Sequence, residues 1–423
     1  MTPSSSAAIG FTTESLFVLS LNKYIFTASN PSLASGKLEM STRFKKLIRQ
    51  VHLWLGLFSG IVVFILGVTG CIYAFSDEIK QVVYADRLFV KPESTPKLPL
   101  SILLAKAQKT VGAEHKILRA QIFNIPNRTY MFRAIKVNKE AYGYWNYYDY
   151  YDLVYINPYS GKVVEKVDAK YEFFTVVLAL HMNLLLGKVI GHFIVRWSVV
   201  CFVILLISGL ILWWPKKWNR KQVKKSFAIK WGAKFKRLNY DLHNVTGFYA
   251  FTVLLVIAAT GLMMSFELTT DPQKAAVSDT TLLNNPNLAT NPADRIFKQA
   301  FASSPQSAYY YYNIPLVNTG TTNVSAYKST GNFYQRVVNK YDQYNGKLLQ
   351  PGKPFNELNL ASQIRTINYD LHTGGALGIT GKIIAFIASL IAATLPITGL
   401  IIWLGKSKKA NRKKKMGILP QVS

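Results

Sequence analysis

Long apolar runs separated by polar segments dominate the pattern of this chain. Four runs lie at 53–75, 193–214, 245–266 and 381–404. Each is long enough for a helix that crosses the hydrocarbon core of a bilayer, which needs about 20 residues. The pattern therefore predicts a mainly α-helical membrane protein with four transmembrane helices, and the lipid bilayer as a partner.

The two longest polar segments show the same order of elements. Each begins with helical periodicity and continues with the β-branched and aromatic alternation typical of strands. The expected helices are 99–112 and 292–303, and the expected strands are 116–124, 128–137, 150–158, 162–166, 307–315, 320–329 and 333–342. The two segments are thus predicted to fold as two α+β modules on one side of the membrane.

Matched spacing indicates that the chain is a tandem duplication. His52 and His243 each precede a glycine by eighteen residues, Gly70 in one case and Gly261 in the other. Each predicted half contains an outward span, an outer module, a short histidine-bearing helix and an inward span. The expected segments are 40–78 (first span), 79–171 (first module), 172–217 (short outer helix and second span), 218–239 (basic loop), 240–267 (third span), 268–365 (second module), 366–405 (short outer helix and fourth span) and 406–423 (basic tail).

The N-terminal segment 1–39 differs in composition from the rest. It is rich in Ser, Thr and Ala and lacks the basic region, apolar core and cleavage site of a signal peptide. Met40 begins a basic stretch that runs directly into the first span. We therefore expect 1–39 to be disordered, or to result from an upstream start site.

Positive charge is concentrated on one side of the predicted spans. The formal net charge is +29, and Lys and Arg cluster in 43–49, 216–237 and 406–415, which contain no acidic residue. The positive-inside rule places these segments, and both termini, in the cytoplasm. Because topology accounts for the charge, nucleic acid is not an expected partner.

Four of the six histidines occupy positions that match between the halves. His52 and His243 lie at the cytoplasmic ends of the outward spans, and His181 and His372 lie just before the inward spans on the outer side. Ionisable side chains inside a membrane are rare and usually functional. If the halves pack face to face, His52 faces His243 and His181 faces His372, which creates two bis-imidazole sites.

A b-type haem suits such a site. Its iron accepts two axial imidazoles, its macrocycle fits an apolar slot between helices, and its propionates favour a basic rim. Two haems per chain are therefore expected. A single interfacial histidine is more often a hydrogen-bonded packing residue, so the matched pairing is what favours ligation. Zinc or copper would require further Cys, Asp or Glu ligands in register, which the spans lack; a transient metal pathway remains an alternative.

Two other features have competing interpretations. His192, which aligns with Lys382, is a further candidate as a propionate contact or alternative ligand, or else packs at a helix end. The tyrosines of 142–155 and 309–312 form either a platform for a flat or chelating ligand or ordinary aromatic strands. No nicotinamide or flavin motif occurs in a suitable context, so electrons would come from another molecule.

Over about residues 43–409 the chain resembles the PepSY-associated transmembrane proteins, also described as iron-regulated membrane proteins. The resemblance rests on RQVHLWLGL, LHMNLLLGKVIG, YDLHNVTG and LHTGGALGITG, and on the outer turns YINPYSGK and YDQYNGK. It implies PepSY-like outer modules, a bacterial inner-membrane location, and haem-bearing helices that carry electrons to ferric-siderophore iron outside. It also implies His52, His181, His243 and His372 as the ligands.

The leading prediction is a haem-dependent reductase of a ferric siderophore or another ferric chelate. Its electrons would come from an external donor, either a cytoplasmic reductase or a quinol. One alternative is a permease for a siderophore or another small molecule, because transporters are often built from repeats. Another is a non-enzymatic protein whose PepSY-like modules restrain an extracytoplasmic protease. The spectrum of low-spin haem would separate the first prediction from the other two.

Overall fold

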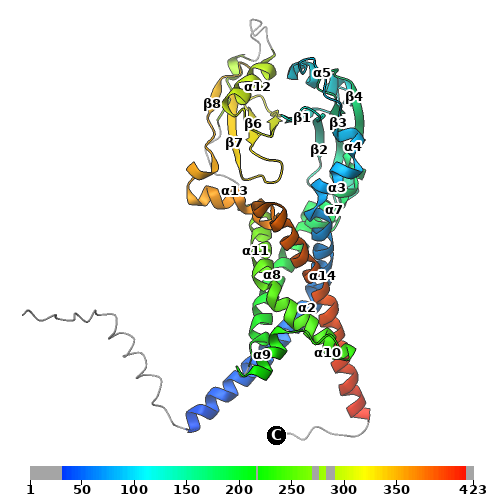
Figure 1. The fold of residues 1–423 in the computed structure, drawn as a ribbon, viewed down its shortest axis with the longest axis vertical. Coiled ribbons are helices and arrows are strands. Elements are labelled where there is room, and N and C mark those ends of the chain that lie inside the picture. The colour runs from blue at the N-terminus through cyan, green and yellow to red at the C-terminus, as the bar shows by residue number, and fades with distance from the viewer. Residues whose placement is uncertain (1–30, 216–217, 269–275, 283–290, 416–423) are drawn as a thin grey trace, which may run out of the picture. The chain divides into compact units, whose positions relative to one another are not determined.

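The computed structural model describes residues 31–215, 218–268, 276–282 and 291–415, and Figure 1 labels its elements. The chain divides into two compact units, Met1–Val51 and His52–Ser423. The first unit contains the beginning of the long helix α2 (Pro31–Ala74). Most of the segment 1–39, for which the sequence predicts disorder or a start-site artefact, lies outside the described residues. The second unit contains the remaining elements.

Within the described residues, four helical segments are long and apolar enough to cross a membrane: Arg43–Ala74, Lys188–Trp213, Phe235–Ser265 and Gly375–Lys406. This confirms the predicted multi-pass helical membrane protein. The segments comprise α2, α8 (Lys188–Trp213), α10 (Phe235–Asp241) with α11 (Gly247–Ser265), and α14 (Gly378–Lys415). A π-helical turn, Leu242–Thr246, joins α10 to α11.

Small residues line the contacts among these helices. Leu206 of α8 packs with Ala250 and Leu254 of α11 and with Ala388 and Ala392 of α14. Alanine allows close approach of helix backbones, which matters inside a bilayer because lipid is as apolar as the side chains and packing must supply the attraction. Close van der Waals packing between the helices, rather than exclusion of water, therefore stabilises the bundle.

Two short helices lead from the outer segments into the spans. Helix α7 (Phe173–Asn183) precedes α8, and α13 (Leu360–Thr373) precedes a 3₁₀ turn (Gly375–Leu377) and α14. Each short helix ends at a residue in the left-handed conformation, Leu184 or Gly374. The chain therefore turns sharply just beyond the end of each short helix.

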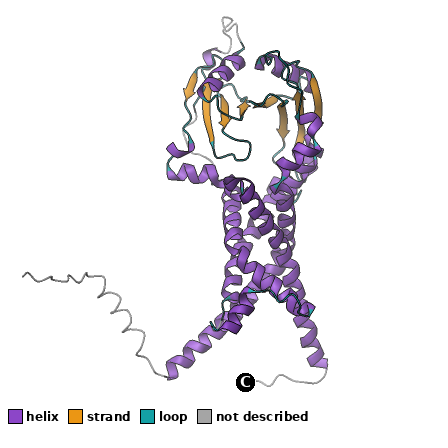
Figure 2. Cartoon of the chain, viewed as in Figure 1, coloured by secondary structure: helices purple, strands orange, loops and turns teal. Residues whose placement is uncertain are grey.

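The strands of both outer segments form one antiparallel sheet of eight strands, in the order β4-β3-β2-β1-β5-β6-β7-β8 (Figure 2). The strands are β1 (Ile117–Phe123), β2 (Tyr130–Val137), β3 (Tyr148–Ile156), β4 (Val163–Asp168), β5 (Tyr309–Asn313), β6 (Thr321–Tyr327), β7 (Arg336–Asp342) and β8 (Leu348–Gln350). The seven expected strands are confirmed, whereas β8 was not predicted.

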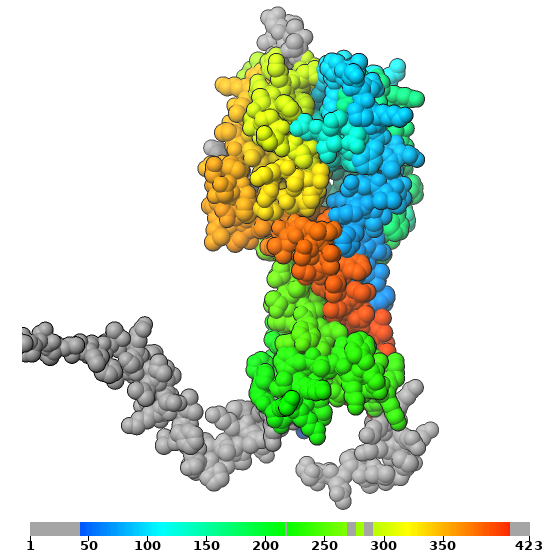
Figure 3. Space-filling model, in the orientation of Figure 1, coloured from blue at the N-terminus to red at the C-terminus, as the bar shows by residue number. Residues whose placement is uncertain are grey.

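The pairing of β1 with β5 joins the two segments. It runs from Arg119 opposite Asn313 to Phe123 opposite Tyr309, and the two segments meet along a continuous surface in Figure 3. The sequence predicts two modules, whereas the structure shows a single shared sheet. The physical reason is that a four-stranded half would leave β1 or β5 as an edge with unpaired backbone groups, and their pairing removes both edges.

Each face of this sheet has a different character. Helices α5 (Leu100–Val111) and α12 (Pro292–Ser303) cover one face, and alternate strand residues such as Ile122, Tyr310 and Tyr312 are buried there. Because side chains alternate along a strand, the intervening residues point to the opposite face. That opposite face lines the cavity considered below.

The remaining helices are short. On the sheet side they are α3 (Ser76–Val83), α4 (Ala85–Leu88), α6 (Tyr144–Tyr147), and the 3₁₀ turns Ala169–Tyr171, Thr280–Leu282 and Phe355–Glu357. At the other end of the bundle, α9 (Arg220–Phe227) lies in the basic loop.

Candidate functional site

Two pairs of histidines lie within the helical bundle. The ring centroids of His52 and His243 are 6.3 Å apart, with the ring planes at 90°. Those of His181 and His372 are 6.2 Å apart, with the planes at 71°. We call these the distal pair and the proximal pair, according to their distance from the sheet. The structure thus places together the histidines that matched spacing suggests as partners.

Each pair takes one histidine from each half of the chain. His52 lies on α2, and His243 lies in the π-helical turn before α11. Turns of this kind are rare and are frequent at functional sites. His181 and His372 lie in the last turns of α7 and α13. His192 lies on α8 and, among the described residues, has no ring contact with either pair.

A hydroxyl group on α8 or α14 contacts each imidazole of the distal pair. Nδ1 of His52 lies 2.8 Å from Oγ of Ser208 on α8. Nδ1 of His243 lies 2.9 Å from Oγ1 of Thr398 on α14. Each hydroxyl belongs to the same half of the chain as the histidine that it holds.

The proximal pair has the same arrangement on α2 and α11. Nδ1 of His181 lies 2.9 Å from Oγ1 of Thr69 on α2. Nδ1 of His372 lies 3.2 Å from Oγ1 of Thr260 on α11 and 2.9 Å from the carbonyl oxygen of Ile257. The first and third spans therefore each carry a histidine of the distal pair near one end and a hydroxyl for the proximal pair near the other.

These contacts define the tautomer of the imidazoles. The hydroxyl groups donate their own proton to a carbonyl one turn earlier in the helix; Oγ1 of Thr69 lies 2.7 Å from the Ile65 carbonyl, and Oγ1 of Thr260 lies 2.7 Å from that of Val256. Thr398 and Ser208 make the equivalent bonds. A hydroxyl has one proton, so it accepts from Nδ1–H. Nε2 therefore carries the lone pair, which is the state in which histidine binds a metal.

A glycine follows each of the four hydroxyl residues. A methyl group added to Gly261 would lie 3.0 Å from Cε1 of His372, and one added to Gly399 would lie 3.3 Å from Cε1 of His243. Gly70 and Gly209 have the equivalent places beside His181 and His52. The missing side chain gives each imidazole room to lie against the neighbouring helix.

The hydroxyl residues were missed by sequence reasoning, although their signal is present. Matched spacing identified glycines such as Gly70 and Gly261 as repeat positions. Ser/Thr-Gly dipeptides occupy matching positions of the corresponding spans, at 69–70 and 260–261 and at 208–209 and 398–399, and could have revealed the hydrogen-bond partner that precedes each glycine.

The pentapeptide Asn-Tyr-Asp-Leu-His was missed as well. It occurs at 239–243 and again at 368–372, so that it ends at one histidine of each pair. In the first copy Nδ2 of Asn239 donates to the carbonyl oxygen of Thr398 at 3.0 Å. In the second copy Nδ2 of Asn368 donates to the carbonyl oxygen of Thr260, the threonine that contacts His372, at 3.1 Å. Each asparagine thus connects the histidine-bearing helix to the residue that holds the imidazole.

Burial keeps the proximal imidazoles neutral. It lowers the pKa of His181 to about 4, with a further contribution from His372, and it also lowers the pKa of His372. Burial raises the pKa of Asp370, although hydrogen bonds from the backbone N–H groups of Phe333 and Tyr334 act in the opposite direction. The proximal histidines are therefore available as neutral metal ligands at physiological pH.

Fold and site together define a multi-pass helical membrane protein that can hold one metal between two imidazoles at each of two places. A model of the PepSY-associated TM region matches residues 49–406, which is most of the chain. The chain therefore belongs to the family of proteins with a PepSY-associated transmembrane region. A comparison with curated proteins found no significant match.

Proposed function

We propose that this protein is a di-haem electron conduit of the bacterial inner membrane. It would reduce a ferric siderophore, or another ferric chelate, on the outer side and release Fe(II) for iron acquisition. The observation that carries this proposal is the presence of two imidazole pairs in which a hydroxyl group contacts every Nδ1, which leaves the lone pair of each ring on Nε2.

The donor set of each pair fits a haem. A metal bound at about 2.0 Å by two opposed imidazole nitrogens separates the ring centroids by about 6 Å, and both pairs have this separation. Among the described residues, no group of three or more His, Cys, Asp or Glu side chains lies together. Two imidazoles would suffice to hold a haem, whose macrocycle supplies the remaining nitrogen ligands, whereas zinc requires about four ligands from the protein.

A bound haem with two imidazole ligands supplies reversible one-electron transfer at its iron. The residues of this chain provide the rest. The hydroxyls of Ser208, Thr398, Thr69 and Thr260 orient the imidazoles and increase their basicity, which favours the ferric state. The apolar spans exclude water, and the glycines beside the histidines allow close packing.

The spacing along the spans supports transfer across the membrane. His52 and Thr69 lie on one helix, α2, but belong to different pairs. Their seventeen-residue separation corresponds to about 25 Å of helix, and the same separation recurs between His243 and Thr260. The two pairs would therefore lie toward opposite faces of a hydrocarbon core of about 30 Å.

The symmetry of these contacts supports a tandem duplication. Each half supplies the hydroxyls for its own two histidines, while each pair combines one histidine from either half. Within the second unit, the basic loop that contains α9 and the basic end of α14 lie at the end of the bundle away from the sheet. The positive-inside rule would therefore place the distal pair near the cytoplasm and the sheet outside.

The proposed reaction transfers one electron to each Fe(III). A cytoplasmic reductase or a quinol would supply the electron at the distal pair. Fe(II) would then leave the chelator, because hard oxygen donors bind it far more weakly than Fe(III).

Reconstituted liposomes test this function. A low-potential, membrane-impermeant reductant is trapped inside, and Fe(III)–citrate with an Fe(II)-specific chromophore is added outside. Fe(II) should appear outside with the native protein and should fall to the protein-free rate with the His243→Ala variant. Equal rates for native protein and protein-free liposomes would contradict the proposal.

A further inference from the structure

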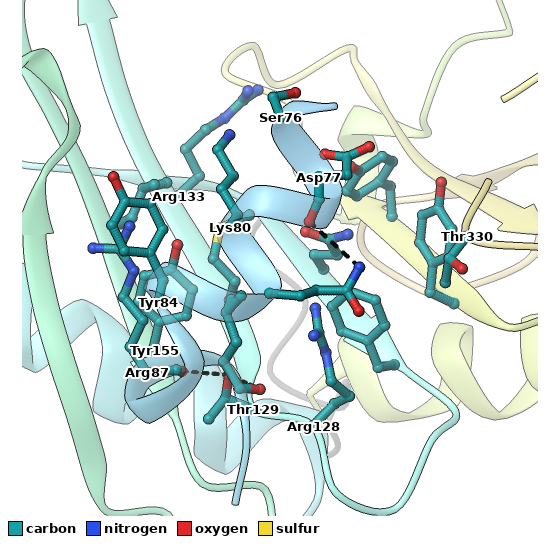
Figure 4. A pocket seen from close by; sticks show the side chains of 18 of the residues that line it. Ser76, Asp77, Lys80, Tyr84, Arg87, Arg128, Thr129, Arg133, Tyr155 and Thr330 are labelled. Carbon is teal, nitrogen blue, oxygen red and sulfur yellow. Dashed lines mark hydrogen bonds between the residues drawn. The ribbon is translucent and has the colours of Figure 1, made fainter. Parts of the chain in front are cut away.

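A cavity of about 420 Å³ lies between the sheet face that α5 and α12 leave uncovered and the end of the helical bundle. This volume lies within the range of about 300–1,000 Å³ that is typical of small-molecule sites. Figure 4 shows Lys80, Arg128 and Arg133 of the first half around this space, and Thr330 of the second half across from them. Both halves therefore contribute to the wall.

Positive charge predominates on this wall. Six cationic side chains line it, compared with three carboxylates. Two of these carboxylates are already engaged: Glu172 accepts from the hydroxyl of Tyr84 at 2.9 Å, and Asp370 accepts from the backbone N–H of Phe333 at 2.8 Å. The cations are Lys80, Arg87, Arg119, Arg128, Arg133 and Lys382. Arg87 forms an ion pair with Glu165 and Lys382 forms one with Glu78, which leaves four cations without an ion pair among the described residues.

Two of the arginines repel each other. Arg119 on β1 lies directly opposite Arg133 on β2, and like charges at opposed positions destabilise a sheet. Within the described part of the chain, neither forms an ion pair with a carboxylate. Burial lowers the pKa of Arg119, with a smaller contribution from Arg133. This arrangement is unfavourable unless an anion compensates it.

Buried guanidinium nitrogens in the cavity wall lack partners. Nε of Arg87, Arg128 and Arg133 is buried without a hydrogen bond among the described residues. The Arg87 residue as a whole is only 8% exposed. A buried donor that stays unsatisfied is costly, and a charged one more so. Carboxylate or phenolate oxygens of a ligand would offset the charge of these guanidinium groups, because guanidinium matches them in geometry.

Aromatic rings form the remaining wall. Tyr309 and Tyr311 line the cavity, whereas Tyr310 and Tyr312, which alternate with them, lie in the hydrophobic core on the other face of the sheet. The guanidinium of Arg128 lies 4.4 Å from the ring centre of Phe123. Such walls suit the flat faces and hydroxyl groups of a chelating ligand.

The cavity adjoins the proximal histidine pair. Tyr369 and Thr373 line it, and on α13 they lie on either side of His372 in sequence, three residues before it and one after it. Tyr73, at the end of α2, lines it as well. A ligand in this space would therefore rest on the helix that carries a proximal imidazole.

We infer that this cavity binds an anionic ferric chelate, whose carboxylate or catecholate oxygens are held by Arg119, Arg128 and Arg133. The identity of the ligand as the electron acceptor rests on the proposed function. The anion site itself rests on the opposed arginines and the unpartnered guanidinium nitrogens.

Calorimetric titration of the full-length protein in detergent with Ga(III)–citrate tests the inference without electron transfer, because Ga(III) is not reduced. Saturable binding should weaken as salt is increased. Arg119→Gln and Arg133→Gln should each weaken binding about tenfold or more, since each removes a charge-assisted hydrogen bond. Arg133→Lys should retain most of the affinity. Arg295→Gln on α12, outside the cavity, removes the same charge from the same side and should bind as the native protein does.

Selectivity provides the second readout. A neutral Ga(III) tris-hydroxamate and metal-free citrate should both bind at least about tenfold more weakly than Ga(III)–citrate. The inference is overturned if Ga(III)–citrate does not bind, if both Gln variants elute as folded monodisperse protein with native affinity, or if metal-free citrate binds equally well. If native protein that lacks haem binds Ga(III)–citrate, the result supports the anion site and contradicts the proposed function. If haem-loaded, active protein does not bind Ga(III)–citrate, the result supports the proposed function and contradicts the anion site.

Discussion

At the scale of single residues, the Ser/Thr-Gly dipeptides explain how an apolar bundle can hold imidazoles in one orientation. The hydroxyl accepts from Nδ1–H, and the glycine leaves space for the ring beside the helix. Neither residue would be expected to bind a metal itself. Their effect is to fix the ring and to leave the lone pair on Nε2, the nitrogen that a metal would bind.

Removal of one hydroxyl tests this role. Thr398→Val keeps the side-chain shape but removes the acceptor at 2.9 Å from Nδ1 of His243. If the distal pair holds a haem as proposed, its imidazole becomes a weaker donor to iron. We then expect the midpoint potential of that haem to rise and its affinity to fall about 10- to 100-fold. Redox titration followed in the visible spectrum measures the change.

Thr394→Val is the matched control, because Thr394 is exposed on the same helix and donates its hydroxyl to the Ile391 carbonyl. This variant should keep the native potential. Equal potentials in Thr398→Val and the native protein would show that the hydroxyl does not tune the site.

A glycine substitution probes the space beside the proximal pair. The added methyl group of Gly261→Ala would lie 3.0 Å from Cε1 of His372 and must displace the imidazole. We expect loss of one of two low-spin haem signals in the electron paramagnetic resonance spectrum. Gly405→Ala on α14, where the new methyl group meets open space, should leave both signals. Native signals in Gly261→Ala would disprove the close contact.

At the scale of elements, the sequence predicted those helices and strands whose formation depends on neighbouring residues. Apolar runs predicted the spans, because length and hydropathy alone decide membrane crossing. Alternation predicted strands such as β5 and β6, and helical periodicity predicted α5 and α12. The histidine partners followed from matched spacing, which is information carried by the whole chain.

Other elements could not be predicted because their cause is not local. The pairing of β1 with β5 joins residues about 190 positions apart, and no local pattern encodes that choice of partner. Strand β8 has only three residues, too few for a pattern of alternation. The π-helical turn at 242–246 contains residues that fit an ordinary helix equally well.

The β1–β5 pairing is itself testable. Gln121 and Tyr311 are directly opposed, and opposed residues in a sheet lie within the Cα distance that a disulfide requires. In a background with Cys71 and Cys201 replaced by Ser, the pair Gln121→Cys and Tyr311→Cys should cross-link on oxidation. The pair Gln121→Cys and Thr322→Cys, on β1 and β6, should not. Mass spectrometry of the digested protein measures the cross-link; efficient cross-linking of only the second pair would contradict the shared sheet.

At the scale of the whole molecule, the two halves of the chain are joined in two places, the sheet and the histidine pairs. They complete one sheet through β1 and β5, and each histidine pair takes one member from either half. Each half nevertheless orients its own histidines through its own hydroxyls. The proposed cofactor sites therefore lie at the junction of the halves, between surfaces that each half shapes by itself.

Haem content in paired histidine variants tests the central claim most directly. The pyridine haemochrome assay should give two haems per chain for the native protein, with the visible spectrum of six-coordinate low-spin haem b. His52 and His243 share one site, so the double variant His52→Ala with His243→Ala should retain one such haem. His52 and His181 serve different sites, so His52→Ala with His181→Ala should retain none. A colourless, correctly folded native protein, or the opposite result for the two double variants, would contradict the account.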